Sequence, residues 1–346
     1  MWRMLSAPLE APPKEAARSC ARVNSTWTRS AQRRIVVPLN TKCALLALVL
    51  SALLPACGGG VNDPESARCG SPNATFGEAQ NLGDHSEADV RFTCKDAVLA
   101  GTLYLPSGSG PFPAVVWIHG SGEQTRVPYA AAVVGPLVQK GIAVLSYDKR
   151  GAGDSEGTCC PGDDGHYNLL AADADGAIVA LRSRSDIDGA RVGFYGPSEA
   201  GWVVPLADSR LTDPVAFTAL VSGPTVTTGE EAAWSKAAGE DEPGPLTKEK
   251  RAEATQKVED AGPSGFDPLP YIKKMQTPGL WLYGGGDKSI PTDRCVAILE
   301  ELKATGKKFT TVVFPDAGHG LVDTVPTDPD APTTLVNWIE QTVKSI

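Results

Sequence analysis

The stretch that decides the fold is RVGFYGPSEAGWVVPLAD, residues 191–208. It starts with β-branched and aromatic residues typical of a buried strand, passes through a glycine-flanked turn, and continues in a pattern that fits a helix. A strand, a sharp turn and a helix in this order can present Ser198 as a nucleophile. The same serine can also cap the helix that follows. The rest of the chain decides between these interpretations if it supplies a base, an acid and an oxyanion hole.

Apolar strand-like segments alternate with helix-like segments on both sides of this stretch. This alternation predicts an α/β fold with a mostly parallel sheet and helices on both faces. Two antiparallel strands are expected within 88–106. Further strands are expected within 112–120, 141–148, 191–196, 214–223, 278–287 and 308–319, and helices within 128–140, 166–184, from 199 onward and within 332–346.

The segment 224–270 breaks this alternation, because it is polar and too long for a simple connection. It predicts a small helical insertion or lid, and its Glu and Lys run at 230–260 predicts a solvated face. The whole chain has 346 residues, of which 42% are hydrophobic, enough for one large α/β domain. Its formal net charge of -9 argues against nucleic acid as a partner, since binding to phosphates needs a basic surface.

The N-terminal part reads as an export signal. Residues 41–60, TKCALLALVLSALLPACGGG, combine a basic lead-in, an apolar run and small residues before a cysteine. Leu54-Pro55-Ala56-Cys57 resembles a bacterial lipobox, which implies lipidation at Cys57 and attachment of an exported protein to a bacterial membrane. The alternative is an ordinary signal peptide. We therefore expect an extension and signal over 1–56, a tether over 57–86, and the folded domain over 87–346.

Eight cysteines also fit an exported protein better than a cytosolic one. Three of them belong to the region expected to be processed. Among the others, Cys69–Cys94 is the preferred disulfide, because it would join the tether to the first strand. Cys159 and Cys160 are left open as a pair, as partners of other cysteines or as free thiols.

Candidate catalytic residues follow the predicted strands, where the reactive groups of a parallel sheet gather. Ser198, Asp287 and His319 occur in the chain order of an α/β-hydrolase triad. A serine hydroxyl needs a neighbouring imidazole to take its proton, and a carboxylate to hold that imidazole in one tautomer. Asp316 is the main rival of Asp287 as the acid. His119 stands in a glycine-rich loop and is expected to shape that loop rather than act as the base.

A tetrahedral oxyanion needs preorganised N–H donors. The backbone N–H of Glu199 and that of Ser121 or Gly122 are the candidates, with Ser121 preferred. Asp148, Arg150 and Asp154 stand in another strand-end segment, SYDKRGAGDSEG, and are expected to form a turn held by its own ion pair.

At these residues the chain resembles bacterial α/β-hydrolases of the esterase, dienelactone hydrolase and serine aminopeptidase kind. The resemblance covers about residues 88–346 and implies a nucleophile at Ser198, an acid at Asp287 and a base at His319, with oxyanion donors from Ser121 and Glu199. One departure is Ala200, which replaces the last glycine of the family's G-x-S-x-G turn. The resemblance is carried by VVWIHGSGEQTR, LSYDKRGAGDSEG, GFYGPSEAGWVVPLA, PLPYIKKMQTPGLWLYGGGDKSIP and FPDAGHGL.

These observations predict an envelope serine hydrolase that cleaves carboxylic esters through an acyl-enzyme. The alternatives are a peptidase or amidase with the same triad, and a non-catalytic binding lipoprotein, which the alanine at position 200 suggests. No cofactor is implied, and no metal, because four histidines without paired ligand spacing do not indicate a metal site. The sequence decides neither acyl nor alcohol specificity, nor the oligomeric state.

Overall fold

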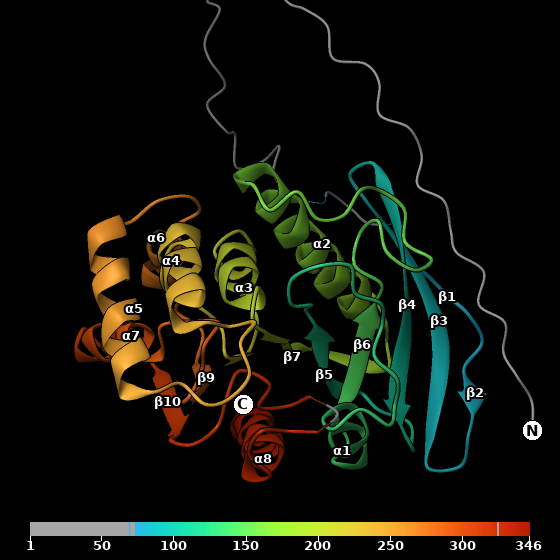
Figure 1. The fold of residues 1–346 in the computed structure, drawn as a ribbon. Helices are drawn as coiled ribbons and strands as arrows, with labels where there is room; N and C mark the ends of the chain where they lie inside the picture. Colours follow the sequence, from blue (N-terminus) through green and yellow to red (C-terminus); the bar gives the residue numbers. More distant parts are fainter. Residues whose placement is uncertain (1–68, 70–72, 324) are drawn as a thin grey trace, which may run out of the picture. The chain divides into compact units, whose positions relative to one another are not determined.

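The computed structural model describes residues 69, 73–323 and 325–346 (Figure 1). The expected signal segment, the lipidation site Cys57 and most of the expected tether lie outside the described residues. Within the described part, no helix has both the length and the apolar character that a membrane crossing requires.

A ten-stranded sheet forms the centre of the fold, in the order β1-β3-β4-β6-β5-β7-β8-β9-β10, with β2 paired to β3. The pairings from β6 through β5 to β10 are parallel, whereas those among β1 to β4 and between β4 and β6 are antiparallel. The strands are β1 (Thr75–Phe76), β2 (Gln80–Asn81), β3 (His85–Cys94), β4 (Ala97–Pro106), β5 (Phe112–Trp117), β6 (Ala143–Tyr147), β7 (Ile187–Pro197), β8 (Thr218–Val221), β9 (Gly279–Gly284) and β10 (Phe309–Phe314).

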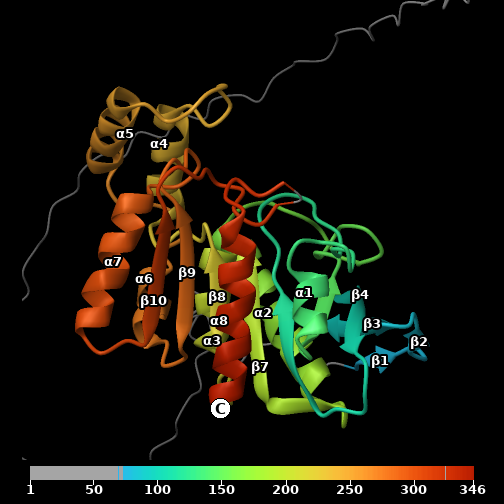
Figure 2. The same ribbon diagram turned by 90° about the horizontal axis from the view of Figure 1, so that it is seen from below.

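Helices cover both faces of this sheet, as the sequence predicts (Figure 2). One apolar cluster joins the sheet to α2 (Asp164–Arg182), α3 (Ala200–Asp208), α6 (Leu269–Lys274) and α7 (Thr292–Ala304). A second cluster on the other face contains α1 (Val134–Gln139) and α8 (Asp330–Ser345). The central strands are buried from both sides, which is why their sequences are continuous apolar runs.

The insertion expected over 224–270 contains α4 (Thr228–Ala238), α5 (Lys248–Ala261) and the start of α6. A capping box starts α4: the Thr227 hydroxyl accepts from the Glu230 N–H, and the Glu230 carboxylate accepts from the Thr227 N–H. α4 and α5 share a small apolar cluster around Trp234 and Val258. The insertion therefore has a core of its own, although most of its residues are polar.

Two expectations about the N-terminal part of the domain need correction. The segment 75–81, which the sequence predicts as part of the tether, adds β1 and β2 to the sheet, and β3 starts before the expected boundary at 87. The preferred Cys69–Cys94 disulfide is not formed. Both thiols are free, and the Cys69 Sγ donates to the backbone oxygen of Thr93 at 3.3 Å. A hydrogen bond between the two thiols, together with burial, raises the pKa of Cys94.

The neighbouring cysteines at 159 and 160, which the sequence left open, are joined to each other. They lie in the loop that leads from β6 to α2. Cys295 is a free, buried thiol, so the pair Cys159–Cys160 is the one disulfide among the five described cysteines.

Candidate active site

Ser198 stands between the end of β7 and the start of α3, in a backbone conformation with φ of 52°. Positive φ is strained for a residue with a side chain, and such strain is typical of a nucleophile turn. The turn is crowded: a Cβ on Gly196 would lie 2.5 Å from the Cβ of Ala200, and one on Gly201 would lie 2.5 Å from the backbone nitrogen of Pro224. The methyl group of Ala200 fits this turn because Gly196 has no side chain.

Asp287 and His319 lie beside Ser198 in a hydrogen-bonded chain. His319 Nε2 is 3.0 Å from Ser198 Oγ, and His319 Nδ1 is 2.8 Å from Asp287 Oδ2. If Nδ1 carries the proton and donates to Asp287, Nε2 can accept the serine proton. The fold thus brings these three predicted residues together from the ends of β7, β9 and β10. The rival acid Asp316 is exposed.

The Asp287 carboxylate is fixed in orientation. It is buried, with 1% of its surface exposed, and its Oδ1 accepts hydrogen bonds from the N–H groups of Ser289 at 2.8 Å and Ile290 at 3.1 Å. Burial alone lowers the pKa of His319, but the hydrogen bond to Asp287 and that carboxylate's charge outweigh it and raise the pKa above the ordinary value of 6.5. The pair is therefore arranged to stabilise an imidazolium.

A cleft of about 410 Å³ opens at Ser198 and His319. The insertion contributes Glu231 and Glu240 to its lining. The Glu240 carboxylate accepts hydrogen bonds from Ser235 Oγ, at 2.6 Å, and from Ser289 Oγ. Burial raises the pKa of Glu231 to about 7, and the charge of Glu240 adds to this shift. The prediction of a solvated face for 230–260 is therefore wrong at the start of that run.

The candidate oxyanion donors Ser121 and Glu199 lie on the two segments next to the nucleophile. Within the described residues, neither of their N–H groups donates to a protein acceptor. A Cβ on Gly120 would lie 3.5 Å from the Cβ of Ser198, so the loop that carries Ser121 approaches the nucleophile closely. His119 contacts the backbone oxygen of Tyr147 through Nε2, and burial lowers the His119 pKa to about 4. His119 therefore holds this loop as a neutral side chain, in line with its expected role.

The sequence predicts that the strand-end turn after β6 is held by its own ion pair, and this prediction is wrong. Asp148 instead pairs with Arg126, with Nε–Oδ1 and Nη2–Oδ2 distances of 3.1 and 2.7 Å, and Arg126 also contacts Asp154 at 2.6 Å. Arg150 forms a buried bidentate pair with Asp173 of α2, at 2.9 and 2.7 Å. The sequence could not identify these partners, because they are distant in the chain.

Sequence reasoning also missed the side-chain role of two residues. The ammonium of Lys149 forms a buried ion pair with the Glu199 carboxylate and donates to the backbone oxygen of Gly120 at 2.9 Å. Lys149 lies inside the segment that the sequence predicts as a turn, and the sequence predicts Glu199 only as a backbone N–H donor. The one signal of this ion pair in the sequence is a lysine next to the end of a buried strand.

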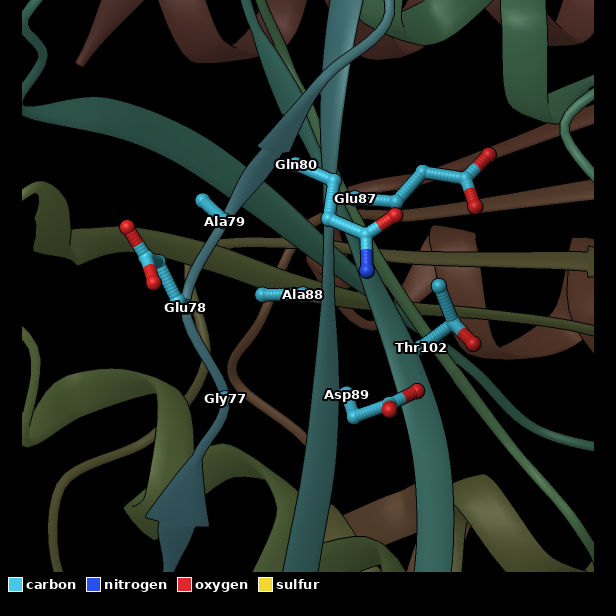
Figure 3. A pocket seen from close by; sticks show the side chains of 8 residues that line it. All are labelled: Gly77, Glu78, Ala79, Gln80, Glu87, Ala88, Asp89 and Thr102. Carbon is cyan, nitrogen blue, oxygen red and sulfur yellow. The ribbon is translucent and has the colours of Figure 1, made fainter.

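A second hollow lies on the antiparallel side of the sheet, away from the nucleophile turn (Figure 3). The segment from Gly77 to Gln80 forms one wall, and side chains of β3 and β4 form the other. The charged side chains at this hollow are Glu78, Glu87 and Asp89, and none of the residues lining it lines the cleft at Ser198. This hollow is therefore separate from the cleft at Ser198.

A positive-φ serine between a strand and a helix, at the carboxyl edge of a mostly parallel sheet covered on both faces, defines an α/β-hydrolase fold. Solved structures agree with this assignment. The acetyl xylan esterase from Paenibacillus sp. R4 superposes with a TM-score of 0.59 at 19% identity, covering 80% of this chain and 92% of that chain. Pyrococcus horikoshii acylaminoacyl peptidase gives a TM-score of 0.55 at 19% identity, covering 76% of this chain and 42% of that chain.

The chain belongs to the prolyl oligopeptidase family, Peptidase_S9, whose pattern matches residues 133–345. Among curated relatives, Esterase EstD of Thermotoga maritima is 28% identical over 249 residues, which is 65% of this chain and 58% of that protein. Thiohydrolase aneE of Aspergillus aculeatus is 33% identical over 117 residues, covering 33% of this chain and 35% of the relative. The chain thus spans about one third to three fifths of the length of these curated relatives.

Proposed function

We propose that this chain is a serine hydrolase that cleaves carboxylic esters through an acyl-enzyme intermediate. The observation that carries the proposal is the hydrogen-bonded chain from Ser198 through His319 to Asp287, with distances of 3.0 and 2.8 Å. Ser198 is the nucleophile, His319 the general base and Asp287 the residue that orients the imidazole. The strained turn and the open cleft in front of Ser198 support these roles.

In the first half-reaction, Ser198 Oγ attacks the ester carbonyl carbon while its proton moves to His319 Nε2. The carbonyl oxygen becomes an oxyanion, which accepts hydrogen bonds from the N–H groups of Ser121 and Glu199. Loss of one such donor costs about 3–4 kcal/mol in other hydrolases. The tetrahedral intermediate collapses, the C–O bond to the alcohol breaks, and His319 gives its proton to the leaving alkoxide.

In the second half-reaction, a water molecule attacks the acyl-serine. His319 takes the water proton as the carbonyl oxygen again becomes an oxyanion. The intermediate then releases the carboxylic acid as the proton returns from His319 to Ser198 Oγ. Asp287 stays ionised throughout and stabilises the imidazolium in both halves, which fits the raised pKa of His319.

Small esters are the proposed substrates. The cleft of about 410 Å³ suits a short acyl chain, and both EstD and the Paenibacillus enzyme are described as esterases. A peptidase or amidase with the same residues is the second candidate, which the family's name and the acylaminoacyl peptidase structure favour. The two candidates differ in whether an amine must be expelled, a step that depends on proton delivery from His319.

Hydrolysis of p-nitrophenyl esters from acetate to palmitate, by the full chain and its Ser198→Ala variant, tests the proposal. We expect turnover of short esters by the parent and a loss of at least about 10⁴-fold in the variant. Aminoacyl p-nitroanilides, assayed in parallel, test the peptidase alternative. A parent that hydrolyses neither class, and whose Ser198 does not react with a fluorophosphonate, would favour the binding-protein hypothesis instead.

We further propose that the chain is exported and anchored to a bacterial membrane by a lipid at Cys57. The apolar run and the lipobox-like residues before Cys57 support this proposal. Expression of the full chain and a Cys57→Ser variant with radiolabelled palmitate in a bacterial host provides the test. We expect palmitate label in the parent and none in the Cys57→Ser variant; a parent without label, or equal labelling of both chains, would overturn the anchor.

A further inference from the structure

Lys149 is buried in a place where a lysine rarely lies. It stands two residues beyond the end of β6, and only 2% of its surface is exposed. Its ammonium contacts the carboxylate of Glu199, which is 5% exposed, and the backbone oxygen of Gly120. A buried ion pair has a large desolvation cost and is weak evidence for stability. The segments that this ion pair joins suggest a different role.

The two partners of the ammonium belong to the two segments that carry the proposed oxyanion donors. Gly120 directly precedes Ser121, and Glu199 itself carries the second donor N–H and directly follows Ser198. The backbone of Lys149 makes a further contact, because its N–H donates to the backbone oxygen of Gln124 at 2.9 Å. One residue therefore holds the loop 120–124 at both ends and also holds the start of α3.

We propose that Lys149 is a positioning residue for the oxyanion hole, which its ammonium keeps assembled by joining the loop 120–124 to Glu199. This inference rests on the proposed hydrolase function. Two donors stabilise one oxygen only if their separation is fixed before charge develops. The ammonium also neutralises the Glu199 carboxylate, which would otherwise place an unpaired negative charge next to the developing oxyanion.

Removal of Lys149 alone would leave the Glu199 carboxylate buried without a partner, and such a variant could fail to fold. The test therefore uses the double variant Lys149→Met/Glu199→Leu, which replaces the ion pair by apolar side chains and keeps the backbone N–H of residue 199. The neighbouring ion pair offers a matched control. Arg150→Met/Asp173→Leu removes an equally buried pair that contacts neither the loop 120–124 nor residue 199.

We expect kcat for p-nitrophenyl acetate to fall about 10²-fold in the Lys149→Met/Glu199→Leu variant, with KM changed less than about threefold. Affinity for an aryl trifluoromethyl ketone, which forms an oxyanionic hemiketal with the serine, should fall by a similar factor. Lys149→Arg keeps a cation and donors near Glu199 and Gly120. Its kcat should be at least about tenfold higher than that of the Lys149→Met/Glu199→Leu variant. The control variant should keep kcat within about threefold of the parent.

Amide hydrogen exchange separates this inference from the proposed function. In the folded Lys149→Met/Glu199→Leu variant, we expect faster exchange in peptides that contain residues 120–124 and 199–201 than in the parent or the control. Parent-like kcat and exchange in that variant would overturn the role of Lys149 while leaving the hydrolase intact. A parent without any hydrolase activity or Ser198 labelling would overturn the proposed function, and the oxyanion role of Lys149 with it.

Discussion

The carboxyl edge of the sheet and the helical insertion both face the cleft, but they differ in how their carboxylates are held. At the sheet edge, Asp287 is buried and accepts from two backbone N–H groups and from His319. In the insertion, Glu240 is exposed and is held by two serine hydroxyls, and the carboxylate of Glu231 has no hydrogen bond to a described residue. The sheet edge thus holds the Asp287 carboxylate in one orientation, whereas the insertion places negative charge near the cleft.

This difference leads to a ranking of effects. Changes at the sheet edge should disable the chemistry, because each group there has one functional orientation. Changes in the insertion should shift the pH dependence of the reaction and leave its rate nearly intact. Four variants with matched or internal comparisons test that ranking.

Asp287→Asn should reduce kcat about 10⁴-fold, because an amide at this position no longer selects the tautomer with the proton on His319 Nδ1. The measurement is steady-state hydrolysis of p-nitrophenyl acetate. Asp316→Asn is the matched control, since Asp316 is exposed at the end of the neighbouring strand and was the rival acid in the sequence. A larger loss of kcat in the Asp316→Asn variant would show that Asp316, and not Asp287, is the acid of the triad.

Gly196→Ala should destabilise the fold by about 1–3 kcal/mol, because the added Cβ would lie 2.5 Å from Ala200 Cβ and 2.6 Å from the backbone oxygen of Ile118. Urea unfolding measures the loss. Gly244→Ala in the insertion provides the contrast, because it has no atom within 4 Å of an added Cβ, although its φ of 92° adds some strain. Equal losses in both variants would contradict the crowding inferred for the turn.

The pH dependence offers a finer comparison. Because the His319 pKa is raised above 6.5 and the neutral imidazole is the base, kcat/KM should rise with pH through an apparent pKa above 6.5. The charge of Glu240 helps to raise the pKa of His319. Glu240→Gln should therefore lower the apparent pKa of the kcat/KM profile by a few tenths of a unit, with kcat within about threefold of the parent. Glu242→Gln is the control, since that carboxylate contacts Lys250. A shift to higher pH would contradict the electrostatic assignment.

The smallest effect is expected at Ala200. Ala200→Gly restores the family's usual glycine, but the structure already accommodates the methyl group, so kcat should change less than about threefold. Thermal unfolding should show a loss of up to about 1 kcal/mol, since glycine is a poorer helix residue than alanine. A gain in kcat of tenfold or more would show that the alanine holds Ser198 away from its best position.

The α/β-hydrolase fold could be predicted from the sequence, because buried parallel strands are continuous apolar runs and the helices between them have amphipathic spacing. The positions of Ser198, Asp287 and His319 followed from the same pattern, since strand ends meet at one edge of a parallel sheet. Each of these signals is local in the sequence, and the parallel topology brings the residues at the strand ends together.

The features that the sequence did not reveal depend on pairing between distant segments. The ion pair of Lys149 with Glu199 joins residues 50 positions apart, and Arg126 reaches Asp148 across 22 positions. Residues 75–81 look like a polar tether because edge strands of two residues have no alternation to recognise. The inward position of Glu231 was hidden by the polar composition of the insertion around it.

The most direct test of the central claim is the reaction of the full chain with a fluorophosphonate, with the labelled peptide located by mass spectrometry. We expect stoichiometric labelling at Ser198, and labelling slowed by several orders of magnitude in the His319→Ala variant, because the imidazole activates the hydroxyl. Labelling at another residue, or equal labelling rates in the parent and the variant, would contradict the assignment of Ser198 and His319 as nucleophile and base.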